Sequence, residues 1–315
     1  MWKQEVHKFL EINEIAFEIV QNQSIFEFLF IPKHQLFLHL IDIQTFQNNL
    51  LPNNYFQEFS DKINTQNQRI IHLWEDVYLR NFDLIKSRIL AMIGNSIRLN
   101  ARHCYIKRID MPMAERFLNK NHLQGSAKAK FKYGLFLKPQ YLEKYLGFTI
   151  YDDVESLDGV DLRTSYKQPS EHNPINLLAV ATFSGGRLMK YGERTGQRSY
   201  ELIRFASLHK YSVMGGTDKL LKAFIDEHQP DDIMTYADRD WSDGRSYEKL
   251  GFAKIENSLP QIFYLNPKTG ERFSNKNFMD INYLEIFNAG SVKFIKNTTK
   301  KSSVESTEDF IVEIF

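Results

Sequence analysis

The first hundred residues alternate between short apolar runs and polar turns in a way that predicts a small mixed unit. Apolar side chains recur at helical spacing over residues 75–93 and end at Gly94-Asn95, a typical helix stop. Residues 5–20 show imperfect helical spacing. The strands are expected at residues 25–31, 36–43 and 69–74. We therefore expect a small restriction-endonuclease-like α+β domain over residues 1–97.

Beyond residue 98 the apolar runs are separated by polar turns that predict a second, larger unit. Polar, proline-containing residues 138–175 are interpreted as an insertion, and residues 291–315 as a polar tail. The expected strands are 102–109, 133–137, 177–183, 200–206 and 232–236, and the expected helices are 112–119, 216–226 and 246–250. The fold class is thus α+β, with a mixed sheet and flanking helices over residues 98–290.

Composition fits an ordinary two-domain globular protein. The chain has 315 residues, 43% of them hydrophobic and 25% charged. A formal net charge of +1 argues against nonspecific coating of nucleic acid as the main function, although a local basic surface is compatible with it. The single cysteine, Cys104, cannot form an internal disulfide, which fits a reducing cytoplasm. No secretory signal or apolar run of ~18 residues is present, so we expect a cytoplasmic protein without a membrane span.

Gly215-Gly216 lies where a predicted strand passes into a predicted helix. Such a turn leaves backbone N–H groups exposed at the positive end of the helix dipole, which suits a phosphate or pyrophosphate. Glycine pairs are common in turns, so the pair alone is a weak signal. Its value depends on the elements that follow it, in particular Tyr247-Glu248-Lys249-Leu250-Gly251-Phe252.

Residues 247–252 resemble the Tyr-x-x-x-Gly-Phe element of the GNAT superfamily of CoA-dependent N-acyltransferases. The resemblance covers about residues 105–268 and implies acetyl-CoA or another acyl-CoA as cofactor, with Tyr247 as general acid. The family's Arg/Gln-x-x-Gly-x-Gly/Ala stretch is replaced by adjacent glycines, and Lys210 is the candidate for the basic position. The cofactor-binding residues implied are Val213, Met214, Gly215, Gly216, Thr217 and Lys219.

A wider set of motifs is similar to phage and mobile-element proteins of the homing-endonuclease-like kind, whose C-terminal region is GNAT-like. These motifs lie at residues 70–93, 121–125, 200–205, 213–221 and 235–244. The same region resembles the Mom-type DNA-modifying proteins. The resemblance implies a very-short-patch-repair-type nuclease domain at the N-terminus and DNA or RNA as a partner.

The nuclease residues that this resemblance implies are incomplete. A restriction-type nuclease uses an Asp and a Glu-x-Lys motif on adjoining strands to hold Mg²⁺ and to activate water. Asp42 is the only carboxylate of residues 36–43, and residues 20–75 contain no Glu-x-Lys motif. We therefore expect a catalytically degenerate domain with a structural or DNA-docking role.

Several polar residues of the second unit are candidates for catalysis. Glu201 and Arg204 are three apart on a strand and should face opposite sides of the sheet, with Arg204 pairing with Asp238 as a structural bridge or a substrate site. His122 could be a general base or a hydrogen-bonding loop residue. The candidate catalytic residues are Tyr247, His122, Glu201, Arg204 and Asp238.

Basic and aromatic residues beside this region are candidates for nucleic-acid binding. Arg187, Arg194 and Arg198 form a basic loop that would either contact phosphates or be solvated. Trp241 would either stack on a base or pack in the protein. Asp238, Asp240 and Asp243 resemble a metal cluster, but the interleaved arginines explain them as salt bridges and loop caps, so no metal is predicted.

Taken together, the sequence favours CoA-dependent acyl transfer to an amine, with a nucleobase as one acceptor. The alternative is a GNAT-like fold without cofactor that serves as a DNA-binding module, or a residual nuclease. The sequence indicates neither the acyl group nor the oligomeric state.

Overall fold

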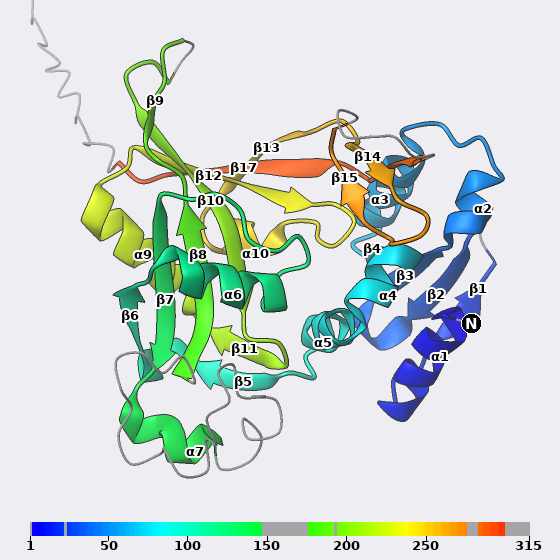
Figure 1. Cartoon of the computed structure of the whole chain (residues 1–315), viewed down its shortest axis with the longest axis horizontal. Coiled ribbons are helices and arrows are strands. Elements are labelled where there is room, and N and C mark those ends of the chain that lie inside the picture. Colours follow the sequence, from blue (N-terminus) through cyan, green and yellow to red (C-terminus); the bar gives the residue numbers. More distant parts are fainter. Residues whose placement is uncertain (1, 22–23, 147–175, 192–193, 276–282, 300–315) are drawn as a thin grey trace, which may run out of the picture.

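The described residues form two large sheets and two small ones. The helix α5 (Phe82–Met92) lies between the two large sheets (Figure 1). The computed structural model describes residues 2–21, 24–146, 176–191, 194–275 and 283–299. Most of the expected insertion at 138–175 and most of the expected tail lie outside these ranges. Within the described ranges, every helix is too short or too polar to traverse a lipid bilayer.

The N-terminal sheet has four strands in the order β1-β2-β3-β4. The first three pair antiparallel, and β3 pairs with β4 in parallel. The three expected strands are present and β1 is additional. The expected 75–93 helix is broken at Asn81 into α4 and α5. The element bounds are α1 Trp2–Ile12, β1 Glu18–Val20, β2 Glu27–Ile31, η1 Pro32–His34, β3 Leu36–Ile41, α2 Ile43–Gln47, α3 Tyr55–Thr65, β4 Arg69–Trp74 and α4 Glu75–Arg80.

The second sheet follows the order β13-β17-β12-β10-β8-β7-β6, with β9 paired to β10. All neighbours are antiparallel except β10 and β12. The strands are β6 Cys104–Arg108, β7 Phe131–Leu137, β8 Leu177–Phe183, β9 Arg187–Leu188, β10 Arg198–Ser207, β12 Asp232–Asp238, β13 Ala253–Asn257 and β17 Ser291–Asn297. The predicted α+β class, with a mixed sheet and flanking helices, is confirmed.

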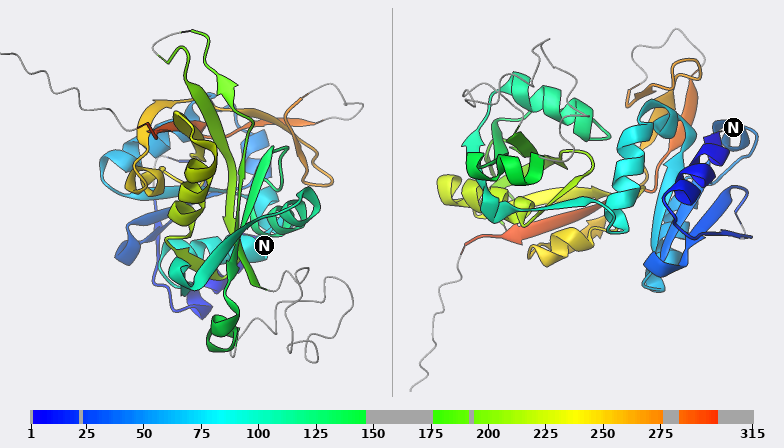
Figure 2. Two further views of the ribbon diagram at one scale, coloured as in Figure 1. Left: turned by 90° about the vertical axis from the view of Figure 1, so that its left-hand side faces the viewer. Right: turned by 90° about the horizontal axis from the view of Figure 1, so that it is seen from below.

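Helices cover both faces of this sheet (Figure 2). On one face, α6 (Met111–Asn121) packs Phe117 and Leu118 against β7 and β8. On the other face, α9 (Gly216–His228) packs Phe224 against Phe183, with parallel rings whose centroids are 3.9 Å apart. The remaining elements are β5 Ile97–Asn100, η2 Ala101–His103, η3 Pro139–Tyr141, α7 Leu142–Leu146, β11 Tyr211–Met214 and α10 Arg245–Lys249.

The C-terminal part of the chain corrects the expected boundaries. The strands β14 (Ile262–Leu265), β15 (Arg272–Phe273) and β16 (Leu284–Phe287) form a small sheet, and β14 and β16 pack on the N-terminal unit. Residues 291–297, expected as the start of a polar tail, instead form β17 between β12 and β13. The alternating Val292, Phe294 and Lys293 explain the strand, because one side is buried and the other carries charge.

Asp240 joins the two units. Its carboxylate accepts hydrogen bonds from the Trp74 indole of β4 at 3.2 Å and from the Ala289 amide at 2.8 Å, and its carbonyl accepts from the His72 amide. Burial, followed by the charge of Asp238, raises the pKa of Asp240 to about 8. Burial therefore favours the protonated, neutral form of this side chain.

This raised pKa predicts a pH-dependent stability. The folded state binds the proton more tightly than the unfolded chain, so the contribution of Asp240 is complete below the unfolded pKa and is lost as pH rises through about 8. Between pH 6.5 and 8, unfolding free energy from urea titrations should fall by roughly 1 to 2 kcal/mol more in the wild type than in Asp240→Asn. The exposed Asp226→Asn is the control. Parallel curves for the wild type and Asp240→Asn would contradict this assignment.

Candidate functional site

The parallel strands β10 and β12 pair over a short distance and then part. Their register covers Ser199↔Asp232, Tyr200↔Ile233 and Glu201↔Met234, although β10 continues to Ser207 and β12 to Asp238. Just beyond the last pair, the Thr235 hydroxyl of β12 donates to the Leu202 carbonyl of β10 at 3.0 Å. A side-chain hydroxyl thus takes the place of the next backbone hydrogen bond between the strands. Beyond it, the carboxyl ends of the two strands separate and carry polar groups.

A bulge in β10 sets which way its charged residues face. Leu202 pairs with Phe183 of β8, and Arg204 pairs with the next residue of β8, Thr182. Ile203 is therefore an extra residue on β10. One extra residue reverses the alternation of side chains. Glu201 and Arg204 were expected to face opposite sides of the sheet, and the bulge corrects this expectation. Burial lowers the pKa of Arg204 on balance, and among the charges that oppose this effect Glu201 is the strongest.

The two glycines lie at a helix start, as expected from the sequence. Gly215 is the N-cap of α9 with φ 75°, in the left-handed region, and no side chain caps the helix. A Cβ at Gly215 would be 3.7 Å from the Ala101 side chain, so the turn is open there, whereas one at Gly216 would press on Val213 at 3.1 Å. The first amides of α9 therefore have no side-chain acceptor of their own.

The other residues expected to bind the cofactor differ in burial and in their contacts. Met214 is exposed and Thr217 is half-buried in the first turn of α9, while Val213 packs against the core. Residues 211–214 form β11, which pairs in parallel with β5. The Lys219 ammonium donates to the carbonyls of Ala101 and Cys104. Lys219 therefore secures the chain before β6, which corrects its expected role at a phosphate.

Polar residues from three elements meet at the ends of β10 and β12. Asp238 Oδ2 accepts from the Gln124 side-chain amide at 3.1 Å. Arg204 Nε donates to the Gly125 carbonyl at 3.2 Å. Among the ion pairs of the described residues, Arg204 with Asp238 is absent, which corrects the expected bridge. Both residues instead hold the loop at 122–125, one on each side.

His122 has a defined tautomer in this arrangement. Its Nδ1 accepts the Gln124 backbone amide at 3.2 Å, so the neutral ring carries its proton on Nε2. Burial lowers the pKa of His122 to about 3, with further lowering by Arg204 and Arg88. The ring is therefore neutral, and its free nitrogen is a donor. This geometry does not favour the general-base role considered from the sequence.

Asp238 has the properties of a proton acceptor. Burial raises its pKa, against smaller lowering effects of the Asp240 amide, Arg272, Arg88 and Gln124. A carboxylate with a raised pKa accepts protons more readily near neutral pH. In the described ranges, no group of three or more His, Cys, Asp or Glu side chains is arranged as a metal site.

Tyr247 lies where β10 and β12 part. It belongs to α10, and its ring packs against Phe252 and Phe294 with centroids 5.5 and 5.6 Å away. Burial raises the pKa of the Tyr247 phenol, while a hydrogen bond with Thr235 and the charge of Arg88 lower it by less. Because Thr235 also bonds Leu202 across the two strands, the phenol is adjacent to the strand junction.

Arg88 was missed by the sequence reasoning. It belongs to α5 of the first unit, yet its charge acts on His122, Asp238 and Tyr247. Its guanidinium lies 5.4 Å from the centroid of the Trp241 ring. A regular helical pattern at residues 82–92 gives no signal that one of its basic residues reaches a second unit.

The residues expected to contact nucleic acid divide into two groups. Arg187 and Arg198 are exposed on the β9–β10 hairpin. Arg194, in contrast, pairs at 2.9 Å with Asp232, a fully buried carboxylate, so its role is structural. Trp241 is 7% exposed, packs with the N-terminal core and is covered by Arg88, which corrects the expectation of a ring open to a base.

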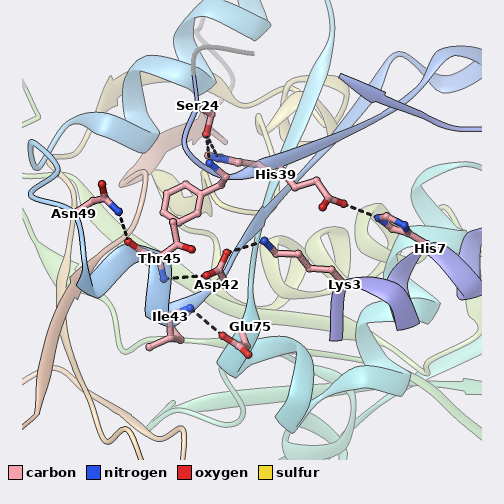
Figure 3. A network of polar contacts seen from close by, with 11 residues as sticks. Lys3, His7, Ser24, His39, Asp42, Ile43, Thr45, Asn49 and Glu75 are labelled. Atoms are coloured by element: carbon pink, nitrogen blue, oxygen red, sulfur yellow. Dashed lines mark hydrogen bonds and ion pairs between the residues drawn. The ribbon is translucent and has the colours of Figure 1, made fainter. Parts of the chain in front are cut away.

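In the N-terminal unit, the carboxylate considered for a nuclease site, Asp42, is engaged in local contacts (Figure 3). Asp42 caps α2 through the Thr45 amide at 2.9 Å and pairs with Lys3 at 2.7 Å. Burial would raise the pKa of Asp42, but the Lys3 and Thr45 contacts lower it on balance. Glu75, the first residue of α4 directly after β4, accepts a hydrogen bond from the Ile43 amide. These carboxylates serve local structure here.

The chain has distant likenesses among solved structures. One is to the NatC complex bound to Gag peptide and CoA, with a TM-score of 0.32 and 10% identity over 62% of this chain and 99% of that chain. Another is to NAA60 of Arabidopsis thaliana in complex with acetyl-CoA, with a TM-score of 0.33 and 10% identity over 62% of this chain and 98% of that chain. No family model and no curated protein matches. These likenesses are too distant to assign a ligand or an activity to this chain.

The site predicts a measurable coupling between His122 and Arg204. Arg204→Gln should raise the pKa of His122, because after burial the charge of Arg204 is the largest cause of its lowering to about 3. NMR titration of the histidine ring signals, assigned with His122→Gln, would measure the change. Arg187→Gln, on the exposed hairpin, should leave it unchanged. A wild-type His122 that titrates near 6.5 would show that the ring is not buried beside these arginines.

Proposed function

We propose that this chain transfers an acyl group from an acyl-CoA thioester to an amine. The observation that carries the proposal is the parting of β10 and β12 beside a helix start that has no side-chain cap. The resemblance of residues 247–252 to the GNAT element supports it, as does the position of Tyr247 at the strand junction.

The residues at the start of α9 fit a pyrophosphate group. Backbone amides near residues 213–217 would hold it, and the helix dipole would favour its negative charge. The left-handed Gly215 leaves room for a close approach. Acetyl-CoA or another acyl-CoA bound there would supply an acyl group activated as a thioester.

The chain's own residues can move the two protons that such a transfer requires. Asp238 would accept the proton that the attacking amine loses, since its raised pKa suits a base near neutral pH. Tyr247 would donate a proton to the departing sulfur, because burial keeps its phenol protonated. His122 Nε2–H would donate a hydrogen bond, and Arg204 would position the loop through Gly125. The products are an amide and a free thiol.

The acceptor that we propose is an amine of a nucleobase, in DNA or RNA. This part of the proposal rests on the sequence resemblance to homing-endonuclease-like and Mom-type proteins of phages and mobile elements. The exposed Arg187 and Arg198 are available for phosphate contacts.

A charge placed in the first turn of α9 tests cofactor binding. Thr217→Glu should weaken acetyl-CoA binding at least tenfold in calorimetry, because the new carboxylate repels the pyrophosphate. The melting temperature should not fall, since acidic residues stabilise helix starts. Thr217→Gln, which lacks the charge, is the matched control. No binding of acetyl-CoA to the wild type at millimolar concentration, or equal binding by Thr217→Glu, would remove the acyltransferase proposal.

A further inference from the structure

A cavity of about 810 Å³ lies between the two units, away from the turn at Gly215. The N-terminal unit contributes residues of α3, β4 and α5, and the second unit contributes the segment 239–249 with parts of β13 and β17. In Figure 1 these elements meet where α5 lies between the sheets. The cavity is therefore a product of the contact between the units.

The cavity wall carries an excess of positive charge. Six lining residues are basic and two are acidic. Both acids are already paired, Asp61 with Arg239 at 2.5 Å and Asp243 with Arg245 at 2.8 Å. Four cations have no ion pair among the residues that the structure describes: Arg69, Arg88, Lys249 and Lys254. The unbalanced charge favours an anionic occupant.

Several buried polar atoms of the wall, Arg88 Nε among them, lack hydrogen-bond partners. Arg239 is 4% exposed, and while its Nη2 bonds Asp61 and the Gln57 carbonyl, its Nη1 has no hydrogen-bond partner. Asn64 Oδ1 is also buried without a partner. A buried polar atom without a hydrogen-bond partner is destabilising, more so when it is charged, so such atoms call for an explanation. The arginine nitrogens Arg88 Nε and Arg239 Nη1 lack an acceptor, and Asn64 Oδ1 lacks a donor.

We propose that this cavity binds a phosphorylated ligand of nucleotide size. The phosphate groups would face Lys249, Lys254 and the arginines, and a donor on the base or sugar would satisfy Asn64 Oδ1. Ligand cavities of small molecules span about 300–1,000 Å³, so a nucleotide fills this one and a lone phosphate does not. This cavity is distinct from the proposed pyrophosphate site, because none of its wall belongs to the turn at residues 213–217.

Charge reversal of the two exposed lysines tests the site without disturbing the core. Calorimetry of the full chain with ATP at low salt should give one saturable site. Lys249→Glu with Lys254→Glu should weaken it at least tenfold. Lys8→Glu with Lys120→Glu changes the net charge equally on exposed helix positions elsewhere, and it should bind as the wild type does. Inorganic phosphate should bind far more weakly than ATP.

The outcomes separate this site from the proposed cofactor site. The inference is overturned if the wild type fails to bind ATP, or if the cavity double variant binds ATP as the wild type does, which would place the nucleotide at the glycine turn. Binding of single-stranded oligonucleotide without ATP binding would also overturn it, in favour of a nucleic-acid strand. Loss of acetyl-CoA binding in Thr217→Glu with ATP binding intact would leave this inference standing on its own.

Discussion

The site depends on the short pairing of β10 with β12. Two neighbouring parallel strands normally satisfy each other's backbone groups along their whole shared length. Here the ladder stops after three residue pairs, and the Thr235 hydroxyl takes the next carbonyl. The polar residues of the proposed site lie beyond that point. The bulge at Ile203 turns Arg204 towards the loop at 122–125. Asp238 ends β12 beside the same loop.

The contact between the two units completes this arrangement. Asp240 follows Asp238 by two residues and is held by Trp74 and Ala289, so the end of β12 is fixed by the N-terminal sheet. Arg88 reaches from α5 towards His122, Asp238 and Tyr247. It also lines the cavity between the units. The N-terminal unit thus contributes to the environment of the proposed site, although its own carboxylate Asp42 is occupied by Lys3 and Thr45.

Local patterns predicted the longer central strands, the main helices and the glycine turn, because helical spacing, buried runs and glycine turns are properties of neighbouring residues. They did not predict β17, whose short amphipathic run resembles a polar tail until it is paired between β12 and β13. They predicted wrongly that Glu201 and Arg204 face opposite sides of the sheet. A bulge depends on pairing with the partner strand, which a local pattern does not contain. Arg88 and the cavity depend on contacts between residues far apart in the chain, for which a single sequence carries no local signal.

Hydrogen exchange in the presence and absence of acetyl-CoA tests the central claim most directly. If acyl-CoA occupies the space where the strands part, bound cofactor should slow exchange of the amides at residues 213–219 and at the ends of β10 and β12. Unchanged exchange at these positions with saturating cofactor, or protection confined to residues 239–254, would contradict the account.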